Sequence, residues 1–313
     1  MPRPQTPRSS GSRSRRPAAA VAATTAAMLL LAACSGSPEP SSGSGTKIGV
    51  VAGENFWGDI ARQIGGDHVT VTSIIEDPDA DPHEYESDAV DAAALARAEL
   101  VIENGLGYDD FMSKLLEASP NSGREVISVQ KVLHITGASP NPHVWYDTAR
   151  VAEVADAIQQ QLSTADPANA TTYAANAQAF DDSLKPIEET IATIKSKYAG
   201  TKIAYTERVP AYLTKAAGLT LGTPQSFTEA VEQGEDPSPA ANAAFESAIT
   251  NRTVKVLLYN GQVTDPETTN IKKLATDAGV PVVGVTETIP STDKDYQSWQ
   301  LRQAEEILAA LGG

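Results

Sequence analysis

Apolar positions along the chain alternate between short strand-like runs and longer helical patterns, which is the sign of a parallel α/β fold. The predicted strands are 47–52, 69–75, 99–103, 125–129, 202–206, 219–222, 254–260 and 281–286. The predicted helices are 55–64, 88–97, 108–118, 148–162, 209–217, 238–249, 266–278 and 294–311. The fold class is therefore α/β, with two Rossmann-like lobes of about four parallel strands each.

One long helical segment, 167–199, connects the two lobes. It is rich in alanine and free of glycine, so it can form a helix of about 30 residues, or roughly 45 Å. Pro186 falls inside it and removes one backbone hydrogen bond. No glycine or turn cluster flanks Pro186, so we expect one bent helix rather than two helices. The predicted domains are an N-terminal lobe at 47–166, the linking helix, and a C-terminal lobe at 200–313.

The first 46 residues have the composition of an export signal and a tether. Basic residues precede an apolar stretch that ends in Leu-Ala-Ala-Cys and is too short to span a bilayer. We therefore interpret 1–33 as a signal peptide. Cys34 is the only cysteine, which excludes an internal disulfide. Its context resembles a bacterial lipobox, which implies cleavage before Cys34 and a lipid on its sulfur. The alternative is an ordinary cleavage site with an incidental cysteine.

The segment 34–46 is rich in serine, glycine and proline and is predicted to be a flexible tether. A lipid and a tether place the folded part outside the cytoplasm, at the outer face of the cell membrane. The net charge is −16, and the predicted signal peptide carries five arginines and no acid, so the mature chain carries −21. This excess of acids argues against nucleic acid as a partner and is compatible with a cationic ligand.

Two of the four histidines share a local context. His83 in DPHEYE and His143 in NPHVWYD each follow an Asp-Pro or Asn-Pro pair and precede an aromatic residue by two positions. Proline stiffens each loop, and both loops follow predicted strands, where open parallel sheets bind ligands. We predict that both histidines bind a metal. His68 and His134 lack this context: His68 is expected in a solvated turn, and His134 lies in a loop that can approach the site.

The second lobe carries carboxylates at matching positions. Glu207 directly follows strand 202–206, and Glu287 directly follows strand 281–286. The four candidate ligands therefore lie at four strand ends and converge if the lobes face each other. Two imidazoles and two bidentate carboxylates would give up to about six donors, which suits Mn²⁺ or Fe²⁺, whereas Zn²⁺ prefers a tetrahedron.

Two further side chains are candidates for orienting the imidazoles, as metal-bound histidines usually require. Asp147 is the candidate partner of His143. Asn104, at a predicted strand end, is the candidate partner of His83 or of a neighbouring loop. For both residues the alternative is a turn or helix cap.

Four segments in this order, DPHEYE, ENGLGYDDF, NPHVWYD and PVVGVTETIP, resemble the metal-binding lipoproteins of zinc- and manganese-type ABC importers. The resemblance covers about residues 47–312. It implies two small α/β lobes joined by a long backbone helix, with one metal ion per chain buried between them. It also implies His83, His143 and Glu207 as ligands, with Glu287 where the family usually has aspartate.

A glutamate at the third ligand position, without a histidine-rich loop, goes with manganese-type members of that family, so Mn²⁺ is favoured and Zn²⁺ is next. The expected function is non-enzymatic capture of a divalent metal and its delivery to an ABC permease that works with an ATPase. We expect a monomer attached to the membrane by its lipid. The alternatives are a surface adhesin and a metal-dependent hydrolase, although no HExxH motif is present.

Overall fold

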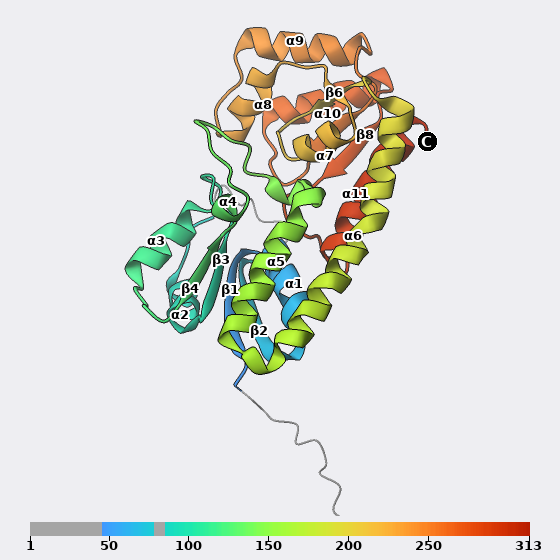
Figure 1. The fold of residues 1–313 in the computed structure, drawn as a ribbon. Coiled ribbons are helices and arrows are strands. Elements are labelled where there is room, and N and C mark those ends of the chain that lie inside the picture. The colour runs from blue at the N-terminus through green and yellow to red at the C-terminus, as the bar shows by residue number, and fades with distance from the viewer. Residues whose placement is uncertain (1–45, 78–84) are drawn as a thin grey trace, which may run out of the picture. The chain divides into compact units, whose positions relative to one another are not determined.

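The computed structural model describes residues 46–77 and 85–313, all within one compact unit (Figure 1). The predicted signal peptide, Cys34, the tether up to residue 45 and His83 lie outside the described residues.

Among the described helices, none is both long enough and apolar enough to cross a membrane.

Each lobe is built on a four-stranded parallel sheet, which confirms the predicted fold class. The first sheet has the order β2-β1-β3-β4 and the second has the order β6-β5-β7-β8. In each sheet the direction of winding reverses between the two central strands, and ligands bind at the carboxyl ends of the strands near such a point. The strands are β1 (Ile48–Glu54), β2 (Val69–Ile75), β3 (Leu100–Glu103), β4 (Glu125–Ser128), β5 (Lys202–Tyr205), β6 (Thr220–Leu221), β7 (Leu257–Asn260) and β8 (Val282–Val285).

The helices follow the predicted order. The first half contains α1 (Asn55–Gly65), α2 (Ala89–Arg97), α3 (Asp110–Ala118), α4 (Val129–Val132), α5 (Thr148–Ala165) and α6 (Ala170–Tyr198), with short 3₁₀ turns η1 (Gly66–His68), η3 (Val144–Tyr146) and η4 (Pro167–Asn169). The second half contains α7 (Ala211–Ala216), α8 (Gln225–Glu232), α9 (Pro239–Thr250), α10 (Pro266–Ala278) and α11 (Tyr296–Leu311).

Side-chain caps explain where several helices begin. Asp88, Asp265 and Asp295 each accept a hydrogen bond from the backbone N–H three residues on, at the starts of α2, α10 and α11. Such a cap satisfies one of the free N–H groups in the first helical turn. At the other end of α10, Gly279 adopts φ +70°, the left-handed conformation that closes a helix without a steric penalty.

Several details of the secondary structure differ from the sequence-based expectation. The short helix α4 was not predicted, and its first residue, Val129, was assigned to the preceding strand. The helix α8 was not predicted, because its eight residues give only three buried positions between Pro224 and Gly234. The strand expected at 254–260 is regular only over β7. Residues before it still pair with β5, since Lys255 N–H donates to the Lys202 carbonyl.

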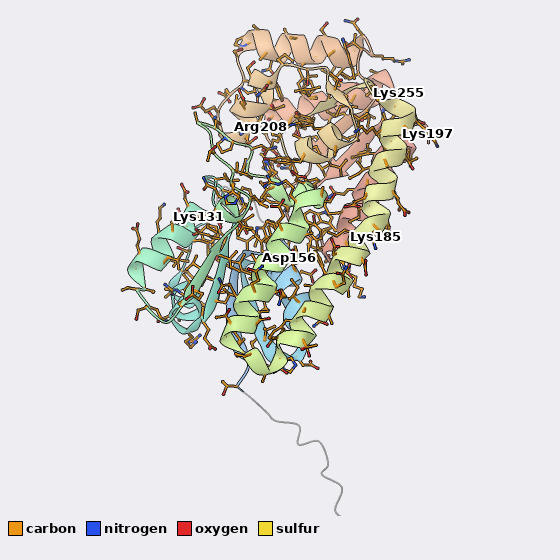
Figure 2. The ribbon with its side chains drawn as sticks, in the orientation of Figure 1. Lys131, Asp156, Lys185, Lys197, Arg208 and Lys255 are labelled. Atoms are coloured by element: carbon orange, nitrogen blue, oxygen red, sulfur yellow. The ribbon has the colours of Figure 1, made fainter. Side chains whose placement is uncertain are left out.

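The linking segment forms one continuous helix, α6, preceded by the short turn η4. Its buried residues recur every three or four positions: Tyr173, Ala177, Phe180, Leu184, Ile187, Ile191 and Ile194. This stripe packs against α1, α5 and α11 (Figure 1). Pro186 lies on the exposed side, and so do Lys185 and Lys197, which follow the outer face (Figure 2). A single helix is therefore confirmed, and its bend at Pro186 stays a prediction.

The main hydrophobic core is shared by both lobes. One cluster of buried side chains runs from Ile48 in β1 through α6 to Leu311 in α11. Aromatic rings fill its centre: Phe56 stacks on Trp145 with ring centroids 4.2 Å apart, and it lies 6.2 Å from Trp299. Two smaller clusters occupy the outer faces, one under α2 and α3 and the other under α8, α9 and α10.

Hydrogen bonds reinforce this shared core. The Tyr296 hydroxyl donates to the Trp145 carbonyl at 2.5 Å. The Asn55 side chain exchanges two hydrogen bonds with the backbone of Ile289. Since these bonds join η3 to α11, and α1 to the loop after β8, we expect the two lobes to unfold as one unit.

Phe56→Ala should lower the free energy of unfolding by about 3–5 kcal/mol, because a fully buried ring is lost from the shared core. Urea unfolding followed by tryptophan fluorescence and by far-UV circular dichroism should give one coincident transition for the wild type and for the variant. Two separate transitions in the wild-type protein would contradict a shared core.

Candidate metal centre

His143, Glu207 and Glu287 lie buried at the carboxyl ends of the two sheets. His143 immediately precedes η3. Glu207 follows β5 by two residues, and Glu287 follows β8 by two residues. Each glutamate follows a threonine that anchors the chain: the Thr206 hydroxyl accepts from Asn260 N–H at 3.1 Å, and the Thr286 hydroxyl accepts from Trp299 Nε1–H at 2.9 Å.

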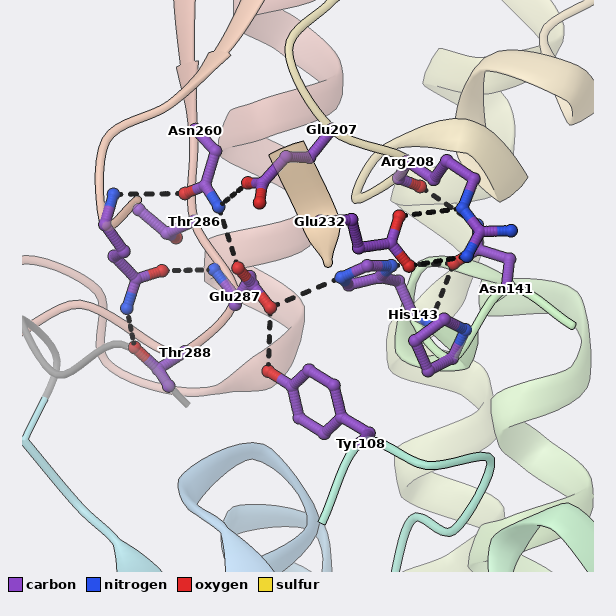
Figure 3. Close-up of polar contacts among 12 residues, drawn as sticks. Tyr108, Asn141, His143, Glu207, Arg208, Glu232, Asn260, Thr286, Glu287 and Thr288 are labelled. Carbon is purple, nitrogen blue, oxygen red and sulfur yellow. Dashed lines mark hydrogen bonds and ion pairs between the residues drawn. The ribbon is translucent and has the colours of Figure 1, made fainter. Parts of the chain in front are cut away.

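An imidazole of the first lobe meets a carboxylate of the second lobe at this point. Nε2 of His143 lies 3.3 Å from Oε2 of Glu287, and both side chains are fully buried (Figure 3). The same carboxylate oxygen accepts a hydrogen bond from the Tyr108 hydroxyl at 2.9 Å. Tyr108 lies in the loop after β3, within the segment ENGLGYDDF. Glu287 is therefore positioned by two side chains of the opposite lobe.

The two glutamates are linked by one amide. Asn260, the last residue of β7, donates through Nδ2 to Glu287 Oε1 at 2.7 Å and also to Glu207 Oε2 (Figure 3). The side-chain Oδ1 of Asn260 accepts from Gln262 N–H at 3.1 Å, which fixes the direction of the amide. Gln262 in turn accepts from the backbone N–H of Glu287. The carboxylates thus approach each other through a neutral donor.

His143 is oriented by Asn141. Asn141 Oδ1 lies 2.6 Å from Nδ1 of His143 and accepts from His143 N–H at 3.1 Å. A proton on Nδ1 satisfies this contact, and Nε2 is the ring nitrogen that faces Glu287. Asp147 was the candidate partner of His143, but Asn141 makes this contact, and Asp147 lies directly before α5. Burial raises the pKa of Asp147, against the opposing effect of Arg150.

Asn104 holds the segment that carries His143. Its Nδ2 donates to the Pro142 carbonyl at 3.0 Å, and its Oδ1 accepts from Trp57 Nε1–H at 3.2 Å. Of the other histidines, His68 is half-buried in η1 with its ring edge-on to Tyr173, and the side chain of His134 is exposed.

Among residues 46–77 and 85–313, no three His, Cys, Asp or Glu side chains are grouped closely enough to hold a metal ion. Two of the three described candidates, His143 and Glu287, are in contact. The third, Glu207, is reached from Glu287 through the amide of Asn260. The fourth candidate, His83, lies outside the described residues.

Sequence reasoning missed Tyr108, Asn141 and Asn260. Asn141 carried a usable signal, because an asparagine two residues before a backbone N–H commonly accepts from it. Asn260 ends a predicted strand, which is the position that open parallel sheets use for ligands. Tyr108 gave no such signal, since its role depends on a residue of the opposite lobe.

A buried acidic pair lies at the same edge of the first sheet. Glu54, the last residue of β1, is fully buried, and neither of its carboxylate oxygens has a hydrogen-bond partner among the described residues. Burial raises the pKa of Glu54 well above its usual value, and the charge of Asp109 adds to this. Burial also raises the pKa of Asp109 to about 7, although two backbone N–H groups, of Asn104 and Gly105, donate to it and oppose the shift.

The family model "Zinc-uptake complex component A periplasmic" matches residues 50–310, most of the chain. The chain belongs to this family. It is therefore the substrate-binding component of a metal ABC importer and acts outside the cytoplasm as a binding protein rather than as an enzyme. Components of this kind work with a permease and an ATPase.

Curated relatives agree with this assignment. A metal ABC transporter substrate-binding lipoprotein of Streptococcus cristatus is 26% identical over 264 residues, covering 80% of this chain and 83% of that protein. A manganese ABC transporter substrate-binding lipoprotein of Streptococcus gordonii is 25% identical over 283 residues, covering 85% and 89%.

Solved structures share the fold of this family member. The substrate-binding protein FpvC of Pseudomonas aeruginosa, solved in complex with Mn²⁺, has a TM-score of 0.70 and 22% identity, covering 85% of this chain and 98% of that chain. A Cd-bound periplasmic metal binding protein from Candidatus Liberibacter asiaticus has a TM-score of 0.67 and 22% identity, covering 85% and 99%.

Glu54→Gln should stabilise the protein at pH 8 and have no effect near pH 4. A carboxyl whose pKa is higher in the folded protein binds its proton more tightly when folded. Its contribution to stability is therefore complete below the unfolded pKa and is lost as pH rises through the folded pKa. Glutamine mimics the protonated form and avoids this loss. Urea unfolding across this pH range measures the effect.

The control for Glu54→Gln is Glu117→Gln on the exposed side of α3. It should change the free energy of unfolding by less than about 0.5 kcal/mol at every pH. A Glu54→Gln protein that is less stable than the wild type at pH 8 would show that the ionised carboxylate is stabilised by its surroundings.

Asn260→Asp should lower the free energy of unfolding of the metal-free protein by about 3–5 kcal/mol, because it replaces the shared donor by a third buried acid. Asn260→Ala should cost less, about 1–3 kcal/mol, because it removes the donor without adding a charge. The matched control is Asn270→Asp, which alters an exposed amide that donates to Glu246. If Asn260→Asp unfolds at the wild-type urea concentration, the amide does not join the two glutamates.

Proposed function

We propose that the protein captures one divalent transition-metal ion with His83, His143, Glu207 and Glu287 and passes it to the permease of its importer. The observation that carries this proposal is the contact of His143 Nε2 with Glu287 Oε2 at 3.3 Å. Fully buried imidazole and carboxylate groups from different lobes converge there. A cation bound between them would hold both lobes.

The electrostatics of the site favour a cation. Glu207 and Glu287 are almost completely buried and share the amide of Asn260. An amide donates hydrogen bonds but brings no charge, so it does not cancel the repulsion between two carboxylates. A divalent ion would cancel that repulsion and replace the hydration that both acids lose on burial.

The donor types favour Mn²⁺, with Zn²⁺ next. The proposed set combines two imidazoles with two carboxylates and includes no thiolate, and carboxylate oxygen suits manganese. Affinity for a given set rises from Mn²⁺ toward Zn²⁺, so preference for manganese has to come from coordination geometry. The longer arm of Glu287, in place of the aspartate usual in the family, is part of that geometry.

We further propose that 1–33 is removed as a signal peptide, that Cys34 carries a lipid, and that 34–46 tethers the lobes 47–166 and 200–313 to the outer membrane face. The helix α6 and the shared aromatic core oppose a wide hinge motion. Release of the ion therefore requires local movement of the ligand loops in a monomer docked on the permease.

Metal analysis and titration test the proposal together. Mass spectrometry of protein purified from its own host should find one Mn²⁺ per chain, and competitive calorimetry should measure Mn²⁺ and Zn²⁺ affinities. His83→Ala and His143→Ala should each weaken metal binding at least about 100-fold. Removing a residue that only orients a metal ligand already lowers metal affinity by about 10–100-fold.

His68→Ala is the matched control, because His68 lies at the opposite end of β2 from the candidate centre. It should bind metal as the wild type does. Undiminished binding by the His143→Ala protein would exclude the proposed site.

A further inference from the structure

Hydrogen bonds tie the segment that carries His143 to the segment that follows Glu207. Asn141 Nδ2 donates to the carbonyl of Arg208 at 2.9 Å. The Tyr212 hydroxyl donates to the carbonyl of Asn141 at 3.0 Å. Both bonds cross between the lobes, one on each side of the same asparagine. They link a residue two positions before His143 to the chain that follows Glu207, at Arg208 and Tyr212.

Arg208 is itself fixed by an ion pair. Its Nε and Nη2 donate to the two carboxylate oxygens of Glu232, at 2.7 and 2.6 Å (Figure 3). The pair is largely shielded from solvent, with side-chain exposures of 13% for Arg208 and 6% for Glu232. Paired charge-assisted bonds of this geometry are stronger and more directional than neutral hydrogen bonds. Glu232, the last residue of α8, thus holds the loop after Glu207 to a helix.

Asn141 joins this ion pair to the imidazole. One end of its amide binds the Arg208 carbonyl, and the other end contacts Nδ1 of His143 at 2.6 Å. Moving the two lobes apart here breaks the bond to Arg208 and releases the group that orients His143. The ring that faces Glu287 and the chain that carries Glu207 are therefore mechanically coupled.

The ion pair also borders open space. Glu207 and Glu232 line the same cavity of about 700 Å³ in the second lobe. Arg208 keeps Glu232 against the loop that carries Glu207. Loss of this pair would loosen one wall between the candidate ligand and the cavity.

We propose that Asn141, Arg208, Tyr212 and Glu232 form an interlobe clasp that sets the rate at which the bound ion leaves. This role rests on the proposed function, because it concerns release of the metal cargo. The clasp residues position the ligands and do not bind the ion themselves. Local opening of the clasp, with the shared core intact, would be enough to free His143 and Glu207.

Stopped-flow measurement of Mn²⁺ release into excess chelator tests the clasp on the whole mature chain. Asn141→Asp keeps the oxygen that faces His143 Nδ1 but removes the donor to Arg208. Its dissociation rate constant should rise about tenfold with little change in the association rate constant, as loss of one such bond allows. Tyr212→Phe, which keeps the ring, should raise it about threefold.

Arg208→Met should raise the dissociation rate constant by about 10–100-fold. Arg208→Lys should raise it less, because lysine keeps the positive charge. Arg302→Met is the matched control, because Arg302 makes a similar bidentate pair with Asp293 within the second lobe. It should lower the thermal unfolding temperature and leave metal release unchanged.

Two results would overturn the clasp. If Asn141→Asp, Tyr212→Phe and Arg208→Met all release Mn²⁺ at the wild-type rate while remaining folded, the contacts do not control release. An equal rise in the Arg302→Met control would show that general loss of stability, and not the clasp, speeds release. A wild-type protein that binds neither Mn²⁺ nor Zn²⁺ would instead remove the proposed function, and the clasp with it.

Discussion

The polar contacts at the carboxyl ends of the two sheets depend on one constraint: the carboxylates of Glu207 and Glu287 are buried close together. Glu207 and Glu287 lose their hydration and lie near each other, which is costly without compensation. The Asn260 amide reaches both, and Tyr108 and His143 reach Glu287 from the other lobe. These contacts hold the two acids and the imidazole near one another, which is the arrangement that the proposed cation site needs.

The rest of the fold keeps this arrangement from relaxing. The helix α6 contributes a stripe of buried residues to a core that includes side chains of both lobes. Phe56, Trp145 and Trp299 pack at its centre. A binding protein whose two lobes share such a core cannot open widely without exposing large aromatic side chains to water. Under the proposed function, control of the cargo resides in loops and short contacts around the site, where local opening costs the least free energy.

The sequence predicted most of the frame, whereas its candidate ligands stay predictions. Strands and helices followed from hydrophobic patterning, and Glu207 and Glu287 stood out because each directly follows an apolar strand. The helix α8 escaped notice because eight residues give too short a pattern. The roles of Asn141 and Tyr108 depend on partners in the opposite lobe, which local patterning cannot reveal. Asp147 looked suited to orient His143, yet the closer Asn141 makes that contact.

A crystal structure of the Mn²⁺-loaded protein, with anomalous diffraction recorded at the manganese edge, tests the central claim most directly. The account predicts a single anomalous peak between the lobes, within coordination distance of His143 Nε2 and of carboxylate oxygens from both Glu207 and Glu287. A peak elsewhere, or one that touches ligands of a single lobe, would contradict it.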